Sequence, residues 1–234
     1  MNKYERFLHS EFVKELEASP RLSELVCKLN GLVKVFVFGG WCRDKIHSCR
    51  YGGYILPADI DLVVDAPLDD DIFRKFARNH FNGFRLQLEE KGRMVDFWPL
   101  ENTFAFTKGF FKPNIQNLLK STIFDVNSVL YEIGDVKLIN GIAIKAIESR
   151  QIGFNCTKYL NDFADLQAYR ALAIAYRLNY SLREDVISFI ADLFDHRSFD
   201  EFVTIVQKYR THVSRDAIHT LYANFLLNKS KVRV

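Results

Sequence analysis

Residues 32–67, LVKVFVFGGWCRDKIHSCRYGGYILPADIDLVVDAP, contain the two features around which the rest of the chain is organised. The first is Leu32 to Phe38, an apolar run rich in β-branched and aromatic residues that ends at Gly39-Gly40. This pattern predicts a buried strand that enters a tight turn, and Trp41 to His47 predicts the first turns of a helix. A Gly-Gly pair between a strand and a helix lets the backbone approach a ligand and points N–H groups at it, so the junction suits an anion such as a triphosphate.

The second feature is another apolar strand, Asp59 to Val64, whose first residues include two acids. Side chains two positions apart on a strand project from the same face, so Asp59 and Asp61 are expected at one site while Ile60 turns into the core. Two close carboxylates repel each other, and a common reason to tolerate that repulsion is a hard divalent cation bound by oxygen ligands. The pair therefore predicts a Mg²⁺ site.

A third acid, Asp96, lies amid apolar neighbours on the second strand of a predicted β-hairpin. The hairpin is indicated by the alternation of Gly83 to Leu88, a turn at 89–92 and a partner strand from Arg93 to Leu100. One interpretation makes Asp96 an edge acid that faces solvent or forms an ion pair. The other makes it the third carboxylate of the site, because two-metal phosphoryl transfer uses one ion to lower the pKa of the attacking hydroxyl and another to hold the triphosphate.

The order Gly39-Gly40-x-x-Arg43-Asp44 followed by Asp59-x-Asp61 resembles the head domain of class II tRNA CCA-adding enzymes and bacterial poly(A) polymerases, within the polymerase-β-like nucleotidyltransferases. The resemblance implies an α+β fold. A nucleotidyltransferase head with a mixed twisted sheet would occupy residues 1–150, and a small all-helical neck domain would occupy residues 151–234. Short helices and hairpins in this order fit no parallel βαβ array, which disfavours a doubly wound fold.

The same resemblance implies an enzyme that uses Mg²⁺ to transfer a nucleoside monophosphate from an NTP to an acceptor, releasing pyrophosphate. Asp59 and Asp61 would hold the metal ions, and Asp96 would complete the metal site and align or deprotonate the attacking 3′-hydroxyl. Arg43 and the two glycines would hold the triphosphate, and Asp44 would brace the turn by hydrogen bonding. The predicted nucleotide-binding residues are Gly39, Gly40, Arg43, Asp44, Asn127, Gln167 and Arg170.

Two motifs depart from the family pattern. Related enzymes have an Arg-Arg-Asp-Phe-Thr-Ile-Asn-Ala motif where this chain keeps only the character of Phe124, Val126 and Asn127, with Ser-Thr-Ile at 121–123 in place of Arg-Arg-Asp. The neck helix of the family carries a Glu-Asp-x-x-Arg pattern that reads the incoming base. Here Arg170 matches the second arginine of that pattern, whereas Gln167 takes the place of the base-reading arginine. Helix-surface solvation is the alternative for Arg170.

Periodic apolar residues predict the other elements. The expected helices are Tyr4 to Leu29 with a break at Ser19-Pro20, Leu68 to Phe81, a neck helix from Asp165, and 183–194, 199–209 and 215–227. A hairpin that turns at Gly134-Asp135 and one further strand from Ile142 to Ile147 are also expected.

Composition narrows the class of protein. A chain of 234 residues with 48% hydrophobic and 14% aromatic residues can bury a substantial core. A formal charge of +3 and a pI near 8.6 permit a polyanionic partner without demanding one. The four cysteines have no spacing typical of a structural zinc site. No stretch has the length or apolarity of a signal peptide or membrane span, so a cytoplasmic protein without a membrane partner is expected.

The acceptor is the least determined part of the prediction. The resemblance favours an RNA 3′ end, with tRNA as the natural case, although the larger helical body and tail of the family are expected to have no counterpart before Val234. A hydroxyl of a protein or of a small molecule is the alternative acceptor. A catalytically inactive nucleotide-binding module is a further alternative, and the sequence leaves the oligomeric state open.

Overall fold

The computed structural model describes residues 1–57, 59–67, 77–80, 82–88 and 93–232, and only the backbone of 228–232. The chain divides into two compact units, Met1–Ile147 and Glu148–Val234. The division predicted after residue 150 lies close to this boundary.

The first unit is built on a seven-stranded sheet with the strand order β3-β4-β5-β2-β1-β6-β7. Within this sheet, β2 pairs parallel with β5, and the other described pairs are antiparallel. The sheet is therefore mixed, as predicted, and two strands distant in sequence, β2 and β5, lie side by side at its centre. The strands are β1 (Val35–Phe38), β2 (Asp59–Val64), β3 (Arg78–His80), β4 (Gly83–Gln87), β5 (Met94–Pro99), β6 (Val129–Glu132) and β7 (Lys137–Asn140).

The N-terminal segment forms two helices, α1 (Lys3–Ala18) and α2 (Pro20–Asn30), and the predicted break at Ser19-Pro20 is confirmed. Ser19 caps α2 by accepting a hydrogen bond from the backbone N–H of Leu22, and Pro20 supplies the first helical residue. A capping box of Asn2 and Glu5 begins α1. These caps explain why one apolar segment becomes two helices.

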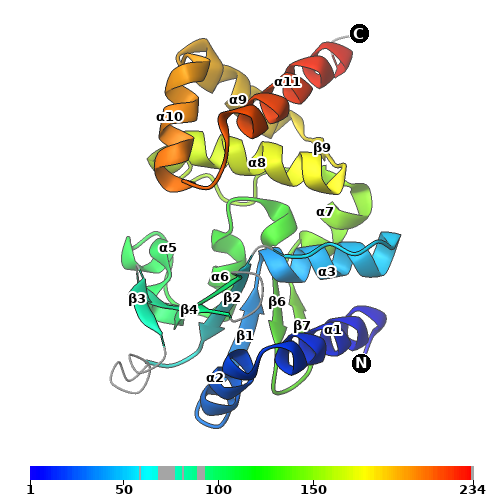
Figure 1. Cartoon of the computed structure of the whole chain (residues 1–234), viewed down its shortest axis with the longest axis vertical. Coiled ribbons are helices and arrows are strands. Elements are labelled where there is room, and N and C mark those ends of the chain that lie inside the picture. Colours follow the sequence, from blue (N-terminus) through cyan, green and yellow to red (C-terminus); the bar gives the residue numbers. More distant parts are fainter. Residues whose placement is uncertain (58, 68–76, 81, 89–92, 233–234) are drawn as a thin grey trace. The chain divides into compact units, whose positions relative to one another are not determined.

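Helices α1 and α3 (Gly40–Tyr51) cover one face of the sheet, and α2 packs next to β1 (Figure 1). The ring of Phe12 on α1 lies 5.6 Å from that of Trp41 on α3 and 6.1 Å from that of Tyr131 on β6. Tyr131 is the register partner of Val37, and Val37 is that of Leu62, so all three belong to this covered face. Residues adjacent to Leu62 in β2 therefore point to the opposite face.

The remaining elements of this region are short. They are η1 (Leu100–Asn102), α5 (Phe104–Thr107), α6 (Ile115–Ser121), η2 (Asp125–Asn127) and α7 (Ala143–Ser149). The predicted strand from Ile142 to Ile147 is wrong, because that segment belongs to α7. Its buried residues Ala143, Ala146 and Ile147 follow helical spacing, and Asn140 accepts a hydrogen bond from the N–H of Ile144 at 3.1 Å.

The helix predicted from Leu68 to Phe81 is wrong at its C-terminal end, where Arg78–His80 forms β3. This strand pairs antiparallel with β4, so pairing along the backbone replaces the predicted helical turn. The part at 68–76 and the turn at 89–92 lie outside the described residues. The hairpin of β4 and β5 is confirmed, and so is the hairpin of β6 and β7.

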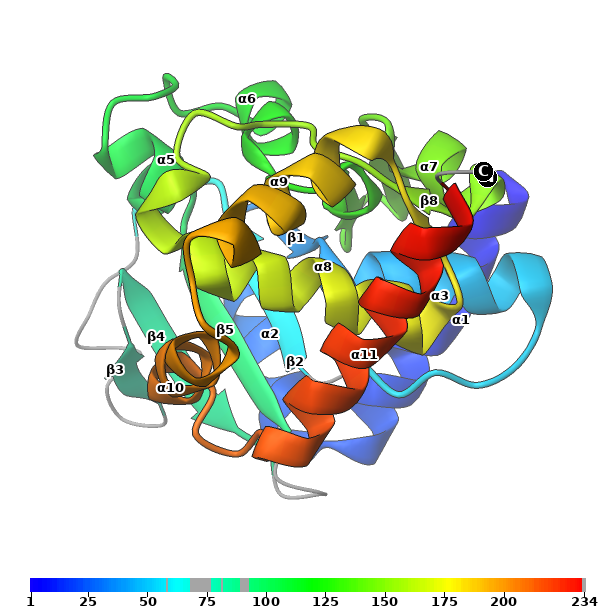
Figure 2. The same ribbon diagram turned by 90° about the horizontal axis from the view of Figure 1, so that it is seen from above.

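The second unit is a helical bundle in which α9, α10 and α11 pack around α8 (Figure 2). Buried apolar residues of these helices include Val186, Ile190, Phe202 and Val206. An all-helical domain was predicted here. The unit also contains a short parallel pair of strands, Gln151–Ile152 (β8) with Ser181–Leu182 (β9). Its elements are β8, η3 (Asn161–Phe163), α8 (Ala164–Leu178), β9, α9 (Glu184–Asp195), α10 (Phe199–Tyr209) and α11 (Arg215–Val232).

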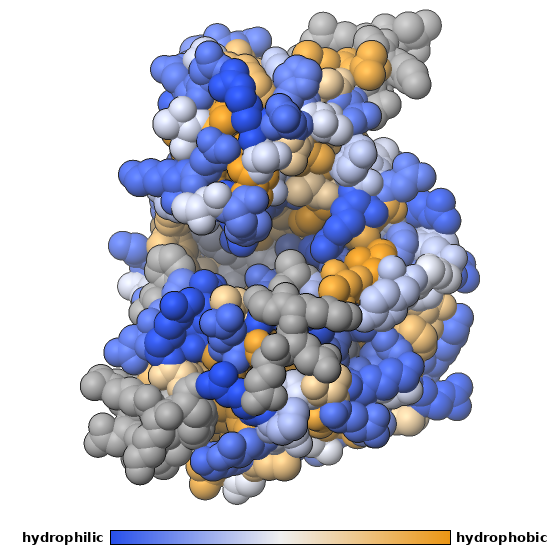
Figure 3. Space-filling model, in the orientation of Figure 1, coloured by the Kyte–Doolittle hydropathy of each residue, from blue (hydrophilic) through white to orange (hydrophobic). Residues whose placement is uncertain are grey.

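Within the described residues, no helix is both long and apolar enough to span a bilayer. Hydrophilic residues prevail on the face of the molecule shown in Figure 3, and hydrophobic ones gather there in small patches.

Candidate active site

Three carboxylates predicted from the sequence lie on one face of the sheet. Asp61 is the register partner of Asp96 on the parallel neighbour β5, and Asp59 lies two residues earlier on the same strand and therefore on the same face. This face is opposite to the one covered by α1 and α3. We refer to Asp59, Asp61 and Asp96 as the acidic face.

The Gly39-Gly40 turn lies at the same end of the sheet as the acids. Phe38, the last residue of β1, is opposite Asp61, so the turn that follows lies beside the start of β2. The backbone N–H of Gly39 donates to the carbonyl of Val129 at 3.0 Å, and α3 begins at the next residue. The turn and the acids therefore border a common region. The first N–H groups of a helix have no partner within the helix, so the start of α3 can bind an anion there.

Gly39 has backbone angles that require glycine, with φ of 63° and ψ of −111°. An added Cβ would meet no atom closer than 3.8 Å, so the constraint comes from the backbone rather than from crowding. We expect Gly39→Ala to lower the free energy of unfolding by about 1–3 kcal/mol. Gly40→Ala is the matched control, since its Cβ would meet the Nη2 of Arg43 at an ordinary 3.7 Å.

Urea denaturation of the two variants measures this difference. Gly40 is the first residue of α3, where alanine is tolerated, so its variant should unfold close to the wild-type midpoint. Equal midpoints for the two variants would show that the turn relaxes without strain.

Three of the predicted nucleotide-binding residues bond to one another. The guanidinium of Arg43 donates to the Oδ1 of Asp44 at 2.8 Å and to the Oδ1 of Asn127 at 2.6 Å. Arg43 is only 5% exposed. The arrangement links the first turns of α3 to η2, so in this structure the three side chains brace the turn, and a direct contact of Arg43 with a triphosphate stays a prediction.

Arg85, which is not among the residues predicted from the sequence, contacts Asp96 of the acidic face directly. Arg85 on β4 is the register partner of Asp96, and its guanidinium binds both carboxylate oxygens, Nε to Oδ1 and Nη2 to Oδ2, each at 2.5 Å. Asp96 thus forms the ion pair that the sequence left open as one interpretation. Two parallel charge-assisted hydrogen bonds of this kind fix the geometry of the carboxylate.

The donor set of the acidic face suits a hard divalent cation, because it offers carboxylate oxygens on adjacent strands. Asp59 and Asp61 are half-buried and project from the same face of β2. In the part of the chain that the structure describes, no group of three or more His, Cys, Asp and Glu side chains is arranged to hold a metal ion. The pair Asp59 and Asp61 fits Mg²⁺, whereas both oxygens of Asp96 accept hydrogen bonds from Arg85.

A cavity of about 260 Å³ borders Asp96, and its lining includes His80, Trp98 and Phe104. Burial lowers the pKa of His80, the positive charge of Arg85 lowers it further, and Asp96 opposes both. The indole of Trp98 donates to the hydroxyl of Thr103 at 3.1 Å, which fixes the ring. The third carboxylate therefore has space beside it that a substrate group can enter.

Two predicted nucleotide-binding residues belong to the second unit. Gln167 and Arg170 lie on α8, where Gln167 is 3% exposed and Arg170 is half-buried. Their role in nucleotide binding stays a prediction.

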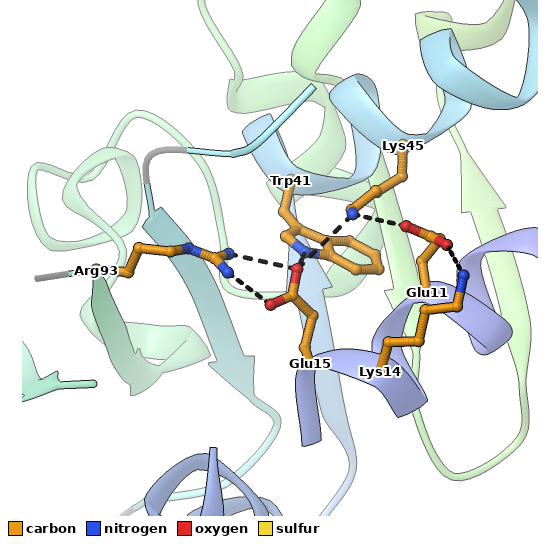
Figure 4. Close-up of polar contacts among 6 residues, drawn as sticks. All are labelled: Glu11, Lys14, Glu15, Trp41, Lys45 and Arg93. Carbon is orange, nitrogen blue, oxygen red and sulfur yellow. Dashed lines mark hydrogen bonds and ion pairs between the residues drawn. The ribbon is translucent and has the colours of Figure 1, made fainter. Parts of the chain in front are cut away.

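A buried network of charges in the first unit joins α1, α3 and Arg93 (Figure 4). Glu15 on α1 accepts hydrogen bonds from the indole of Trp41 at 3.2 Å and from Nη1 of Arg93 at 2.6 Å, and the ammonium of Lys45 lies 3.7 Å away. Lys45 also donates to Glu11 at 2.8 Å. The network links α1 to the helix that follows the Gly-Gly turn and to the residue that precedes β5.

At the level of sequence, the chain matches no protein-family model and no curated protein. Its structure is similar to that of a CCA-adding enzyme in an apo form, with a TM-score of 0.58 and 16% identity over 90% of this chain and 52% of the other. A CCA-adding enzyme with CTP gives a TM-score of 0.60 and 16% identity, over 89% of this chain and 52% of the other. A tRNA nucleotidyltransferase complexed with a primer tRNA and an incoming ATP analog gives a TM-score of 0.57 and 16% identity, over 87% of this chain and 60% of the other.

The chain therefore has an α+β fold, with a mixed sheet followed by C-terminal helices, and this fold is similar to that of the three solved structures. It matches the head and neck region of tRNA nucleotidyltransferases such as the CCA-adding enzymes. The chain spans 52% to 60% of the length of these three solved structures.

Proposed function

We propose that this protein is a Mg²⁺-dependent nucleotidyltransferase that transfers a nucleoside monophosphate from an NTP to the 3′-hydroxyl of an RNA, with a tRNA-type acceptor. The observation that supports this most directly is the strand register. It puts Asp61 opposite both Asp96 and the end of β1, so three acids and the Gly39 turn border one region. Acids for a cation and backbone N–H groups for phosphates are the two requirements of phosphoryl transfer.

In the proposed reaction, the 3′-oxygen forms a bond to the α-phosphorus and the bond from that phosphorus to the bridging β-phosphate oxygen breaks. Pyrophosphate leaves, and the hydroxyl proton passes to a base. Asp59 and Asp61 would hold Mg²⁺, which when bound stabilises phosphate charge and lowers the pKa of the hydroxyl. The N–H groups after Gly39 would orient the triphosphate, and Asp96 would accept a hydrogen bond from the attacking hydroxyl.

The proposed acceptor rests on structural similarity. The similar structures include complexes with CTP, with ATP, and with a primer tRNA and an incoming ATP analog. These ligands are bound to proteins that are 16% identical to this chain. A basic overall charge of +3 is compatible with an RNA partner.

A hydroxyl of a protein or small molecule is the second candidate acceptor. It is favoured by the replacement of positive groups, because Ser-Thr-Ile stands at 121–123 and Gln167 stands where the resemblance places a base-reading arginine. A nucleotide-binding module without activity is a third candidate. It is favoured by the ion pair that occupies both oxygens of Asp96.

Labelling experiments distinguish these acceptors. The purified protein is incubated with Mg²⁺ and each labelled NTP separately, with total RNA, total protein and a small-molecule extract offered in parallel. We expect label on RNA, and we expect prior periodate oxidation of the RNA 3′ end to remove it. Higher salt should reduce the labelling of RNA more than that of a small molecule, because phosphate contacts release counterions.

Label only on protein or on a metabolite would replace the RNA acceptor with the second candidate. NTP binding without release of pyrophosphate from the NTP, whichever acceptor is offered, would favour the inactive module.

A further inference from the structure

Arg85 is a positive side chain positioned within an acidic site. Its guanidinium binds Asp96 through two hydrogen bonds, and its strand β4 adjoins β5, which in turn adjoins β2. Because Arg85, Asp96 and Asp61 are successive register partners, their side chains stand in one row on the acidic face. Arg85 therefore lies at the end of the row that faces away from the Gly39 turn.

Electrostatics couple Arg85 to all three acids. Its guanidinium binds Asp96 directly, and Asp61 and Asp59 project from the same face of β2, the strand next to β5. The guanidinium thus compensates part of the negative charge that the acids place on one face. A divalent cation at Asp59 and Asp61 would supply the same compensation and would repel Arg85.

The Arg85–Asp96 pair is accessible to solvent. The side chains of Arg85 and Asp96 are 25% and 18% exposed, whereas those of Arg93 and Glu15 in the buried network are 12% and 9% exposed. A partly exposed ion pair is screened more than a buried one, and ions can reach it from solvent. The partial exposure of the pair therefore lets a cation from solvent compete with Arg85 for Asp96.

We propose that Arg85 is the resident counter-ion of Asp96 and that a divalent cation bound at the acidic face displaces it, which releases Asp96 for the reaction. Arg85 is thus a positioning residue that holds the third carboxylate until the cation binds. This inference rests on the proposed function, because it concerns the same site.

The test measures binding of Mn²⁺ without nucleotide, by the electron paramagnetic resonance signal of the free ion, for the full chain and its variants. Arg85→Gln removes the charge and keeps most of the side-chain length. We expect it to bind Mn²⁺ about fivefold or more tightly than the wild type, because the competing charge is gone. Arg78→Gln is the matched control, since Arg78 is an exposed arginine and the register partner of Arg85 on β3, and it should leave the affinity unchanged.

Arg85→Lys guards against misfolding of the glutamine variant. Lysine keeps the charge but lacks the planar fork, so its hold on Asp96 is weaker and we expect an Mn²⁺ affinity between those of the wild type and Arg85→Gln. In the Asp96→Asn background, Arg85→Gln should change the affinity by a different factor, because the two residues act through one ion pair. Thermal denaturation checks that each variant is folded.

Unchanged or weaker Mn²⁺ binding by both Arg85 variants would overturn the inference. If the wild type binds Mn²⁺ and Asp61→Ala does not, that result would leave the proposed function intact. If neither the wild type nor any Arg85 variant binds Mn²⁺, the inference fails, whereas the proposed function is decided separately by the labelling experiment with Mg²⁺ and NTP. Tighter Mn²⁺ binding by Arg85→Gln, with the affinity of Arg78→Gln unchanged, supports the displacement.

Discussion

Replacing Asp61 with alanine is expected to abolish nucleotidyl transfer while the protein stays folded. Asp61 stands between Asp96 and the end of β1 in the sheet, so its carboxylate is the central member of the acidic face. If Asp61 holds the cation as proposed, its removal would cost the cation a ligand and would leave the negative charge of the reacting phosphates less compensated. We expect a loss of at least about 10³-fold in the rate of pyrophosphate release, which corresponds to about 4 kcal/mol of activation free energy.

Folding should change little in this variant, because removing one of three neighbouring carboxylates relieves repulsion. Asp65→Ala is the matched control, since Asp65 is an exposed acid just beyond the other end of β2 and its removal changes the net charge equally. It should retain wild-type activity. Transfer by Asp61→Ala at the rate of Asp65→Ala would rule out Asp61 as a ligand of the reacting complex.

The sequence was sufficient to predict the central part of the site because the information there is local. Apolar, β-branched runs and the Gly-Gly turn define β1, the turn and β2, and the common face of Asp59 and Asp61 follows from their spacing alone. Asp96 required the hairpin prediction as well. The parallel pairing of β2 with β5, which brings Asp96 beside Asp61, joins distant segments and could be predicted only through the family resemblance.

Arg85 could have been found from the same hairpin. Counting outward from a turn at 89–92 pairs Leu88 with Arg93 and Arg85 with Asp96, and opposite charges on facing positions attract each other. The prediction of a strand from Ile142 to Ile147 was wrong because the local sequence is ambiguous there. Its apolar residues fit both periods, and the choice of helix depends on which side chains are buried in the folded chain.

The buried network around Glu15 had no signal in the sequence. Glu11, Glu15 and Lys14 resemble the charged positions of an ordinary amphipathic helix, and their partners Lys45 and Arg93 lie far along the chain. Only the packing of α1 against α3 determines which acids become buried and which cations meet them. Long-range ion pairs of this kind are tertiary information that periodicity does not carry.

Glu15→Gln is expected to destabilise the first unit strongly. The substitution keeps the size of the side chain but leaves the guanidinium of Arg93 without the carboxylate that it binds at 2.6 Å. Removing one partner of a buried ion pair costs about 3–5 kcal/mol, because the remaining charge is desolvated and uncompensated. Both tryptophans, Trp41 and Trp98, belong to this unit, so their fluorescence during urea denaturation reports its unfolding.

Two comparisons separate the effect of an uncompensated charge from that of a lost contact. Lys14→Ala removes the exposed partner of Glu11 on the same helix and should shift the urea midpoint little, since the side chain of Lys14 is 67% exposed. The double variant Glu15→Met with Arg93→Met should be more stable than Glu15→Gln, because it removes both members of the pair. If the double variant is instead the less stable of the two, the contacts of Glu15 with Trp41 and of the Arg93 side chain with its neighbours carry the stability, and the charge balance does not.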